Sequence, residues 1–220
     1  MRRKPCATCV KKWACRTTES LSNAGMSSHI AQQQPSRWVS RFAGLIPAGG
    51  LVLDLACGGG RHARHLASLG HQVLAVDRDP AALAAAAGER IGTQAVDLED
   101  NDSPGLPDWP LSPGRFSGIV VTNYLHRPLL PGLCASLAPG GVLIYETFAE
   151  GNSLFGKPSN PAFLLAPGEL LRMASGDADL HVLAFEDGYT EHPQPAMVQR
   201  ICLLRRAAGT DLRTRSLQAG

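Results

Sequence analysis

The sequence predicts an α/β protein with a doubly wound, mostly parallel sheet of seven strands that closes with an antiparallel hairpin. Three observations carry this prediction. Short apolar strands alternate with helical segments over residues 50–147, an order that builds parallel sheets covered on both faces. The turn Gly58-Gly59-Gly60 follows the first strand, and Asp77 ends the second, 19 residues after Gly58. Two long strands then close the pattern with no helix between them.

Hydrophobic periodicity and helix-ending residues place the individual elements of this Rossmann-like sheet. Asp79 caps a helix that begins at Pro80, and Gly70 stops the preceding helix, whose Leu66 and Leu69 are expected to face the core. The expected helices are 35–42, 60–69, 80–90, 128–137 and 167–174. The expected strands are 50–55, 71–76, 92–96, 116–122, 142–147 (after a sharp turn at 139–141), 180–189 and 197–204.

One folded domain is expected, over residues 35–206. Residues 1–34 are polar and basic, which predicts a disordered extension, and residues 207–220 are expected to form a tail. Within the domain, the alternation of strands and helices lapses at 149–167, where a lid-like insertion is predicted over the mouth of the sheet.

The cysteines form two groups. Three near the N-terminus lack a fourth metal ligand nearby, so no metal site is predicted at Cys6, Cys9 and Cys15. The others lie in apolar surroundings and are expected to be buried, reduced thiols; these are Cys57, Cys134 and Cys202.

Charge and hydropathy argue against several classes of protein. No apolar run approaches the ~20 residues that cross a bilayer, and the basic N-terminus lacks the apolar stretch of a secretory signal. A cytoplasmic protein without a membrane partner is therefore expected, as a monomer or homodimer. The total charge is +2, but residues 1–25 and 205–220 carry +5 and +3, which leaves −6 on residues 26–204. This balance disfavours a nucleic-acid substrate, which normally needs a basic face.

The carboxyl ends of the first two strands predict a site for a nucleoside-bearing ligand. A glycine turn lets the backbone approach the ligand closely, and Asp77 can accept hydrogen bonds from ribose hydroxyls. Asp54 lies beside the turn, where its charge would repel a pyrophosphate and favour a cationic ligand such as S-adenosylmethionine. Residues 58–63 also match the loose dinucleotide pattern, so a nicotinamide (NAD)-dependent oxidoreductase stays open as an alternative.

Three segments resemble the first motifs of class I S-adenosylmethionine-dependent methyltransferases: Asp54 to Gly60, Asp77, and Ala95-Val96-Asp97-Leu98. The first segment is similar to the small-molecule, tellurite-resistance-type branch, although Ala56 stands where many members carry glycine. The resemblance spans roughly residues 35–206. It implies methyl transfer by in-line displacement to an oxygen, nitrogen, sulfur or chalcogen atom of a small molecule. A non-catalytic module that binds S-adenosylmethionine is the other alternative.

The resemblance also assigns the parts of the cofactor to residues. The methionine part is expected at the glycine turn, the ribose at Asp77 and the adenine at Asp97, for which a turn cap is the alternative role. The full expected set of cofactor-binding residues is Asp54, Ala56, Cys57, Gly58, Gly60, Asp77, Arg78, Asp97, Leu98 and Asn123.

The tips of the fourth and fifth strands are expected to face the transferable methyl group. Tyr124, His126 and Glu146 are the candidate catalytic residues, with His126 as general base because imidazole titrates near neutrality. Capping of the next helix or exposure to solvent is the alternative for His126, and pairing with an arginine is the alternative for Glu146. Arg127 could hold an anion as a fork, or form a surface ion pair. The candidate substrate-binding residues are Arg127, Phe148, Phe155 and Lys157.

Methyl transfer needs little acid–base catalysis by the protein, because the sulfonium of the cofactor already provides a leaving group. A thiolate or chalcogen oxyanion acceptor would need no base. The protein would align the reacting atoms and exclude water. The basic residues that follow the glycine turn are expected to form a solvated helix face; these are Arg61, His62, Arg64 and His65.

Overall fold

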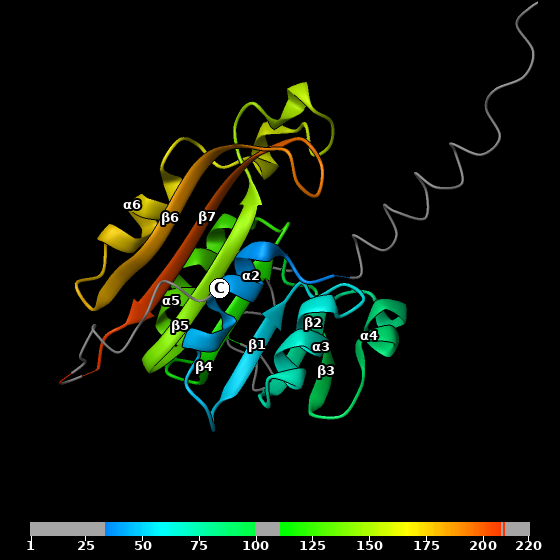
Figure 1. Ribbon diagram of the computed structural model, residues 1–220, viewed down its shortest axis with the longest axis vertical. Helices are drawn as coiled ribbons and strands as arrows, with labels where there is room; N and C mark the ends of the chain where they lie inside the picture. The colour runs from blue at the N-terminus through cyan, green and yellow to red at the C-terminus, as the bar shows by residue number, and fades with distance from the viewer. Residues whose placement is uncertain (1–33, 100–110, 208, 210–220) are drawn as a thin grey trace, which may run out of the picture. The chain divides into compact units, whose positions relative to one another are not determined.

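The computed structural model describes residues 34–99, 111–207 and 209. Its sheet has the strand order β3-β2-β1-β4-β5-β7-β6, with β1 to β5 parallel and β7 antiparallel to both of its neighbours (Figure 1). The predicted fold class is confirmed, including the closing hairpin. The strands are β1 (Leu51–Leu55), β2 (Gln72–Asp77), β3 (Ile91–Ala95), β4 (Phe116–Thr122), β5 (Leu137–Phe148), β6 (Leu180–Thr190) and β7 (Ala196–Arg205).

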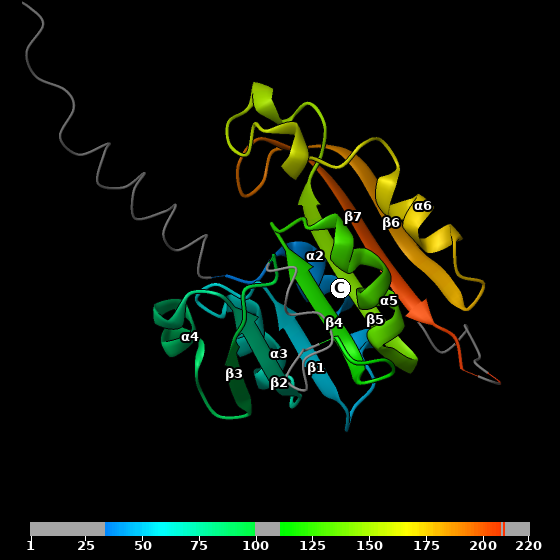
Figure 2. The same ribbon diagram turned by 180° about the vertical axis from the view of Figure 1, so that it is seen from behind.

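Helices cover both faces of the sheet (Figures 1 and 2). On one face, α2, α3 and α4 share a core cluster with Val52 and Ile144, and on the other, α5 and α6 share one with Leu53 and Leu143. Burial on both faces explains why the central strands read as continuous apolar runs. No helix in the described ranges is long and apolar enough to cross a bilayer. The helices are α2 (Arg37–Phe42), α3 (Arg61–Ser68), α4 (Pro80–Ala86), α5 (Leu130–Ser136) and α6 (Glu169–Ser175), with 3₁₀ turns η1 (Ala43–Leu45), η2 (Arg127–Leu129), η3 (Asn152–Leu154) and η4 (Pro161–Phe163).

Three local predictions are wrong. The helix after β2 ends at Ala86 rather than at residue 90, because Ala87 is already extended, with ψ 141°. The sharp turn expected at 139–141 lies inside β5 as an irregularity in its pairing with β4. Leu69 does not reach the core: α3 ends before it, and its side chain is 49% exposed.

The cysteine predictions divide between described and undescribed residues. Cys57, Cys134 and Cys202 are buried free thiols, as predicted. The three N-terminal cysteines lie outside the described residues, as do nearly all of the predicted extension and tail. Within the described ranges, no three His, Cys, Asp or Glu side chains cluster in a way that could hold a metal ion.

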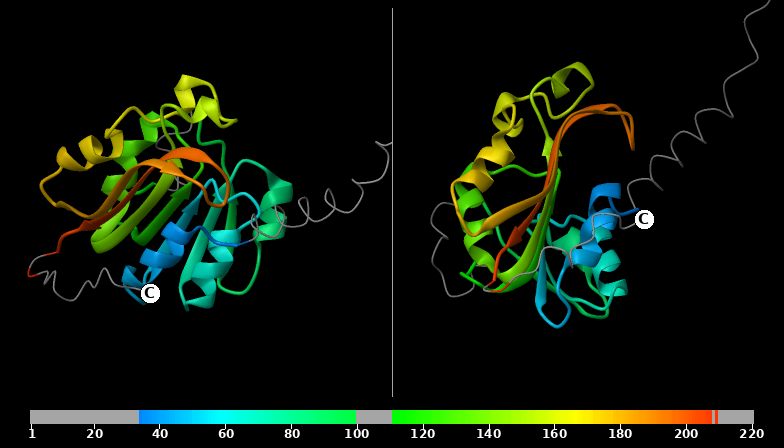
Figure 3. Two further views of the ribbon diagram at one scale, coloured as in Figure 1. Left: turned by 45° about the horizontal axis from the view of Figure 1, so that its top comes forward. Right: turned by 60° about the vertical axis from the view of Figure 1, so that its left-hand side comes forward.

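The insertion at 149–167 lies beyond the carboxyl end of β5, beside the tip of the β6–β7 hairpin (Figure 3). Its two ends meet through a bridge between Ala149 and Leu165. The buried side chain of Asn152 fixes it to the hairpin, because Oδ1 accepts a 3.1 Å hydrogen bond from the backbone N–H of Met197. The insertion is therefore anchored at both its base and its first turn.

Candidate functional site

A carboxylate from β2 closes the glycine turn between β1 and α3. Asp77 Oδ2 accepts a 2.8 Å hydrogen bond from the backbone N–H of Gly58, and Oδ1 accepts one of 3.0 Å from the N–H of Asp79. A carboxylate oxygen can accept two hydrogen bonds, so each of the two Asp77 oxygens keeps one free lone pair. Asp77 is only half-buried. It therefore supports the turn and can still accept hydrogen bonds from a ligand.

The glycine turn packs tightly at one end and is open at the other. Gly60 has φ +75°, and a Cβ there would lie 2.5 Å from the Cβ of Ala86 in α4. Gly58 has φ +50°, but a Cβ there would meet no described atom within 4 Å. Ala56 also has a left-handed φ, of 54°, an uncommon conformation for a residue other than glycine. Gly60 thus brings the turn against α4, and the space over Gly58 can receive a ligand.

Asp54 lies under the turn rather than in the open site. Its side chain is 1% exposed, and Oδ2 accepts a 2.8 Å hydrogen bond from the N–H of Ala63 in the first turn of α3. Burial raises the pKa of Asp54 to about 7, and the Ala63 hydrogen bond and the charge of Arg61 offset this only in part. This corrects the expectation of a charged carboxylate facing the ligand: burial favours the neutral form of Asp54, and its side chain positions the start of α3.

His62 joins three elements beneath the site. Its Nε2 accepts a 3.1 Å hydrogen bond from the N–H of Ser36, which caps α2, and its Nδ1 lies 3.3 Å from Oγ1 of Thr122 at the tip of β4. Because Nε2 accepts, the proton of the neutral ring resides on Nδ1 and is donated to Thr122. Burial, aided by the charge of Arg61, lowers the pKa of His62 to about 3. The predicted solvated face is therefore wrong for His62, and the basic run of the sequence contained no signal of this role.

The expected adenine-side residues differ in their surroundings. Asp97 is exposed, and its Oδ1 accepts a 3.0 Å hydrogen bond from the N–H of Glu99, so the alternative role as a turn cap is present. Leu98 is buried in the core cluster that includes Val76. Arg78 is exposed at the end of β2. Asp97 retains its second oxygen for a ligand, whereas Leu98 is largely taken up by core packing.

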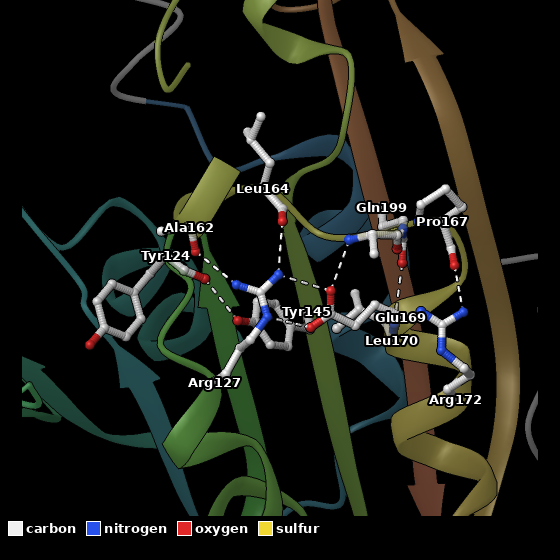
Figure 4. A network of polar contacts seen from close by, with 11 residues as sticks. Tyr124, Arg127, Tyr145, Ala162, Leu164, Pro167, Glu169, Leu170, Arg172 and Gln199 are labelled. Atoms are coloured by element: carbon white, nitrogen blue, oxygen red, sulfur yellow. Dashed lines mark hydrogen bonds and ion pairs between the residues drawn. The ribbon is translucent and has the colours of Figure 1, made fainter. Parts of the chain in front are cut away.

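Tyr124 has a buried hydroxyl without a hydrogen-bond partner among the described residues. Its backbone oxygen accepts a 2.8 Å hydrogen bond from the hydroxyl of Tyr145, and Figure 4 shows its ring directed away from Arg127. Burial raises the pKa of the Tyr124 phenol, so the ring stays protonated and is no base near neutral pH. The charges that also act on the phenol lie at the ends of β2 and β3: Asp77, Arg78, Asp97 and Glu99.

Arg127 is engaged by the insertion and by α6 (Figure 4). Its Nε and one terminal nitrogen bind both oxygens of Glu169, at 2.7 and 3.0 Å. Its terminal nitrogens also donate to the carbonyls of Ala162 and Leu164, each at 2.8 Å. No side of the guanidinium fork is left for an anionic substrate. The alternative role, an ion pair, is the one observed.

Glu146 is at one end of a series of ion pairs that crosses three strands. It pairs with Arg200 of β7, which also donates to Glu186 of β6 at 3.0 Å, and Glu186 lies 3.6 Å from Arg41 of α2. Glu146 and Glu186 face Arg200 in the strand register, which brings the three side chains together. Here too the alternative role, pairing with an arginine, is observed, because Arg200 binds Oε2 of the Glu146 carboxylate.

The remaining expected site residues are spread over the carboxyl edge. His126 is half-buried and is the N-cap residue of η2, where its carbonyl accepts a 3.1 Å hydrogen bond from the N–H of Leu129 but its side chain makes no capping hydrogen bond, so its catalytic role stays a prediction. Asn123 is exposed, with φ 55°, at the tip of β4. Phe148 is half-buried and Lys157 is exposed, while the ring of Phe155 packs on Tyr189 at a centroid distance of 5.2 Å; the substrate role of all three stays a prediction.

Comparison with known proteins finds a family model that matches part of this arrangement. Residues 52–141 match the family model described as a methyltransferase domain, from β1 into β5 and therefore across the glycine turn and Asp77. Over these residues the chain is similar to methyltransferase domains. The matched residues of the domain include the tips of β1, β2 and β4, whereas Glu146 and the insertion lie beyond them.

One curated relative and two solved structures are similar to the methyltransferase domain. Protein-L-isoaspartate O-methyltransferase of Chlorobaculum tepidum is 36% identical over 95 residues, 43% of either chain, so this chain spans less than half of that relative's length. A TehB-like methyltransferase of Corynebacterium glutamicum has a TM-score of 0.56 at 18% identity, covering 85% of this chain and 98% of the other. Geranyl diphosphate C-methyltransferase of Streptomyces coelicolor, with geranyl diphosphate, Mg²⁺ and S-adenosylhomocysteine, has a TM-score of 0.56 at 14% identity, covering 81% and 77%. At such identities the structures show the fold alone.

Proposed function

We propose that this protein transfers a methyl group from S-adenosylmethionine to a small-molecule acceptor. The observation that carries the proposal is the 2.8 Å hydrogen bond from the N–H of Gly58 to Asp77, with open space above the glycine. This hydrogen bond holds the Asp77 carboxylate, which can accept hydrogen bonds from the two ribose hydroxyls, against the glycine turn that a nucleoside ligand must approach. The methyltransferase family of residues 52–141 supports the same activity.

The residues present suit S-adenosylmethionine better than a dinucleotide. Asp77 has a lone pair free on each oxygen, and the hydroxyl of Tyr124 is buried without a partner in the described part of the chain. A pyrophosphate over Gly58 would lie next to Asp77 and close to Asp54, whose remaining charge would repel it. The geranyl diphosphate methyltransferase, which shares the fold, was solved with S-adenosylhomocysteine, the demethylated product of this cofactor.

When bound, S-adenosylmethionine supplies a methyl group on a positively charged sulfur, which leaves without needing a proton. The protein itself contributes by orienting the cofactor and the acceptor and by excluding water. Asp54 and His62 fix the start of α3 against β1 and β4, which holds the glycine turn in place. His126 is our candidate for taking the proton of an acceptor that must lose one, since Tyr124 stays protonated and Glu146 is paired.

A small acceptor is favoured by the insertion that lies beyond the end of β5. Arg127 of η2 binds two carbonyls of this segment and the carboxylate of Glu169 in α6, which fixes the segment beside the edge where the acceptor must enter. The TehB-like neighbour and the geranyl diphosphate methyltransferase suggest small acceptors as well. The name of the Chlorobaculum relative suggests a damaged protein side chain instead, so isoaspartyl peptides belong in the test.

The test is a turnover assay that measures S-adenosylhomocysteine release with a panel of acceptors. The panel should contain thiols, chalcogen oxyanions, amines, phenols and an isoaspartyl peptide. Turnover with one of the small acceptors is the expected result. Turnover with the peptide alone would overturn the small-molecule proposal. Binding of S-adenosylhomocysteine with no turnover would favour a non-catalytic module, and binding of NADH instead would favour an oxidoreductase.

A further inference from the structure

The loop that follows β4 is held by two consecutive residues of β5. Tyr145 is 1% exposed, and its hydroxyl donates a 2.8 Å hydrogen bond to the carbonyl of Tyr124 (Figure 4). The carbonyl of Glu146 accepts a 2.9 Å hydrogen bond from the N–H of Asn123. Tyr145 pairs with Val121 in the strand register, so its side chain reaches three residues further along the chain. A side chain of β5 therefore fixes backbone that lies beyond the end of β4.

This loop has two features that are unfavourable in the free protein. Asn123 has a left-handed φ of 55°, which is strained for a residue other than glycine. The hydroxyl of Tyr124 is buried and has no hydrogen-bond partner among the described residues, which costs its desolvation. Backbone strain and unsatisfied polar groups persist only where surrounding contacts hold them, and they concentrate at functional sites. The hydrogen bond from Tyr145 is a contact of this kind.

The loop after β4 lies beside the glycine turn. β4 is the direct neighbour of β1, with Val121 opposite Leu55, so the two connections follow adjacent strands at the same edge of the sheet. Oγ1 of Thr122 lies 3.3 Å from Nδ1 of His62, which ties the tip of β4 to the helix that follows the glycine turn. A nucleoside ligand over Gly58 would therefore lie next to the loop after β4.

We propose that Tyr145 is a positioning residue, which holds the backbone of Tyr124 so that the Tyr124 hydroxyl is presented to the bound cofactor. This inference rests on the proposed function and extends it to a residue that touches no ligand itself. The cofactor then supplies the partner that the Tyr124 hydroxyl lacks in the free protein. A core tyrosine whose hydroxyl has only a packing role would instead affect stability and leave the affinity unchanged.

The experiment is calorimetric titration of the full chain with S-adenosylhomocysteine, without any acceptor, for Tyr145→Phe, Tyr124→Phe, the double variant and the wild type. Tyr189→Phe is the matched control, since this third tyrosine of the chain is 53% exposed. We expect Tyr145→Phe to weaken binding about 3-fold and Tyr189→Phe to bind as the wild type does. The double variant should bind no more weakly than Tyr124→Phe alone, because residues that act through one group are not additive.

Unchanged affinity in Tyr145→Phe would overturn the inference and leave Tyr145 with a packing role alone. Losses that multiply in the double variant would also overturn it, because Tyr145 would then act independently of the Tyr124 hydroxyl. Urea unfolding of each variant shows that the titrated protein is folded, so that a loss of affinity is not a loss of structure. If the wild type does not bind S-adenosylhomocysteine, the proposed function fails and the inference with it, which is a distinct outcome.

Discussion

Asp77 and Gly58 are joined by a 2.8 Å hydrogen bond, so that a carboxylate of β2 closes the turn that follows β1. The contact spans 19 residues of sequence and two neighbouring parallel strands. It explains why the glycine turn and the acid are found together in the sequence. The same carboxylate fixes the backbone and still has lone pairs for a ribose.

Substitution of Asp54 should change how stability depends on pH. Its folded pKa, about 7, exceeds its ordinary value of 3.8, so the folded protein binds this proton more tightly than the unfolded chain does. The stabilisation is complete below about pH 4 and is lost as the pH rises toward 7. Asp54→Asn keeps an acceptor for Ala63 and removes the titration. Urea unfolding should show the wild type losing on the order of 3 kcal/mol more than the variant across this interval. Parallel pH profiles would contradict the burial of an ionisable Asp54.

Gly60→Ala should destabilise the protein because its Cβ would collide with α4. The φ of +75° adds backbone strain to the 2.5 Å contact with Ala86. The expected loss is about 2–4 kcal/mol in the free energy of unfolding. Gly59→Ala is the control, since a Cβ there meets no described atom within 4 Å and should cost less than ~0.5 kcal/mol. Equal losses for both variants would rule out this packing role of Gly60.

Tyr124→Phe should stabilise the free protein and weaken cofactor binding. Removing a buried hydroxyl without a described partner relieves a desolvation cost of about 1 kcal/mol. Tyr145→Phe is the control, because that hydroxyl donates a 2.8 Å hydrogen bond and its loss should cost about 1 kcal/mol. Stability is measured by urea unfolding and affinity by titration with S-adenosylhomocysteine, for which a 3- to 10-fold loss is expected for Tyr124→Phe. Destabilisation by both variants would show that Tyr124 already has a partner.

Arg127→Ala should loosen the insertion. The change removes four hydrogen bonds to Glu169, Ala162 and Leu164 at a half-exposed position, with an expected loss of about 1–2 kcal/mol. Thermolysin cleavage before Leu154, which is 83% exposed in this segment, should become faster. Arg172→Ala, which removes only a hydrogen bond to a carbonyl at the start of α6, is the control and should leave cleavage unchanged. Equal cleavage rates in all three proteins would show that Arg127 does not anchor this segment.

The sequence could predict the sheet and the glycine turn because their signals are local. Apolar runs, the three glycines and Asp77 lie on neighbouring elements, and strand alternation places them at one edge. The acceptor side was harder to predict, because its partners are distant in sequence. Arg127 meets Glu169 across 42 residues, and Glu146 meets Arg200 across 54. No pattern around either residue shows which arginine or carboxylate will be adjacent.

Burial explains why the predictions for Asp54 and His62, near the glycine turn, differ from the structure. Asp54 and His62 are polar residues beside glycines and arginines, which favours the expectation of exposed, charged groups. In the structure, β1 and α3 pack so closely that both side chains are 1% exposed. Asp54 then accepts a hydrogen bond from the N–H of Ala63, and His62 connects α2 to β4. This packing depends on the tertiary structure, so the local sequence does not reveal it.

Titration with S-adenosylhomocysteine and with NADH, for the wild type, Asp77→Asn and Asp77→Ala, tests most directly whether the Asp77–Gly58 contact forms a site for an S-adenosyl ligand. We expect the wild type to bind one equivalent of S-adenosylhomocysteine and no NADH. Asp77→Ala should lose at least tenfold in affinity, and Asp77→Asn, which keeps one acceptor oxygen, should lose less. Unchanged affinity in Asp77→Ala would contradict the ribose assignment, and tight binding of NADH alone would contradict the proposed cofactor.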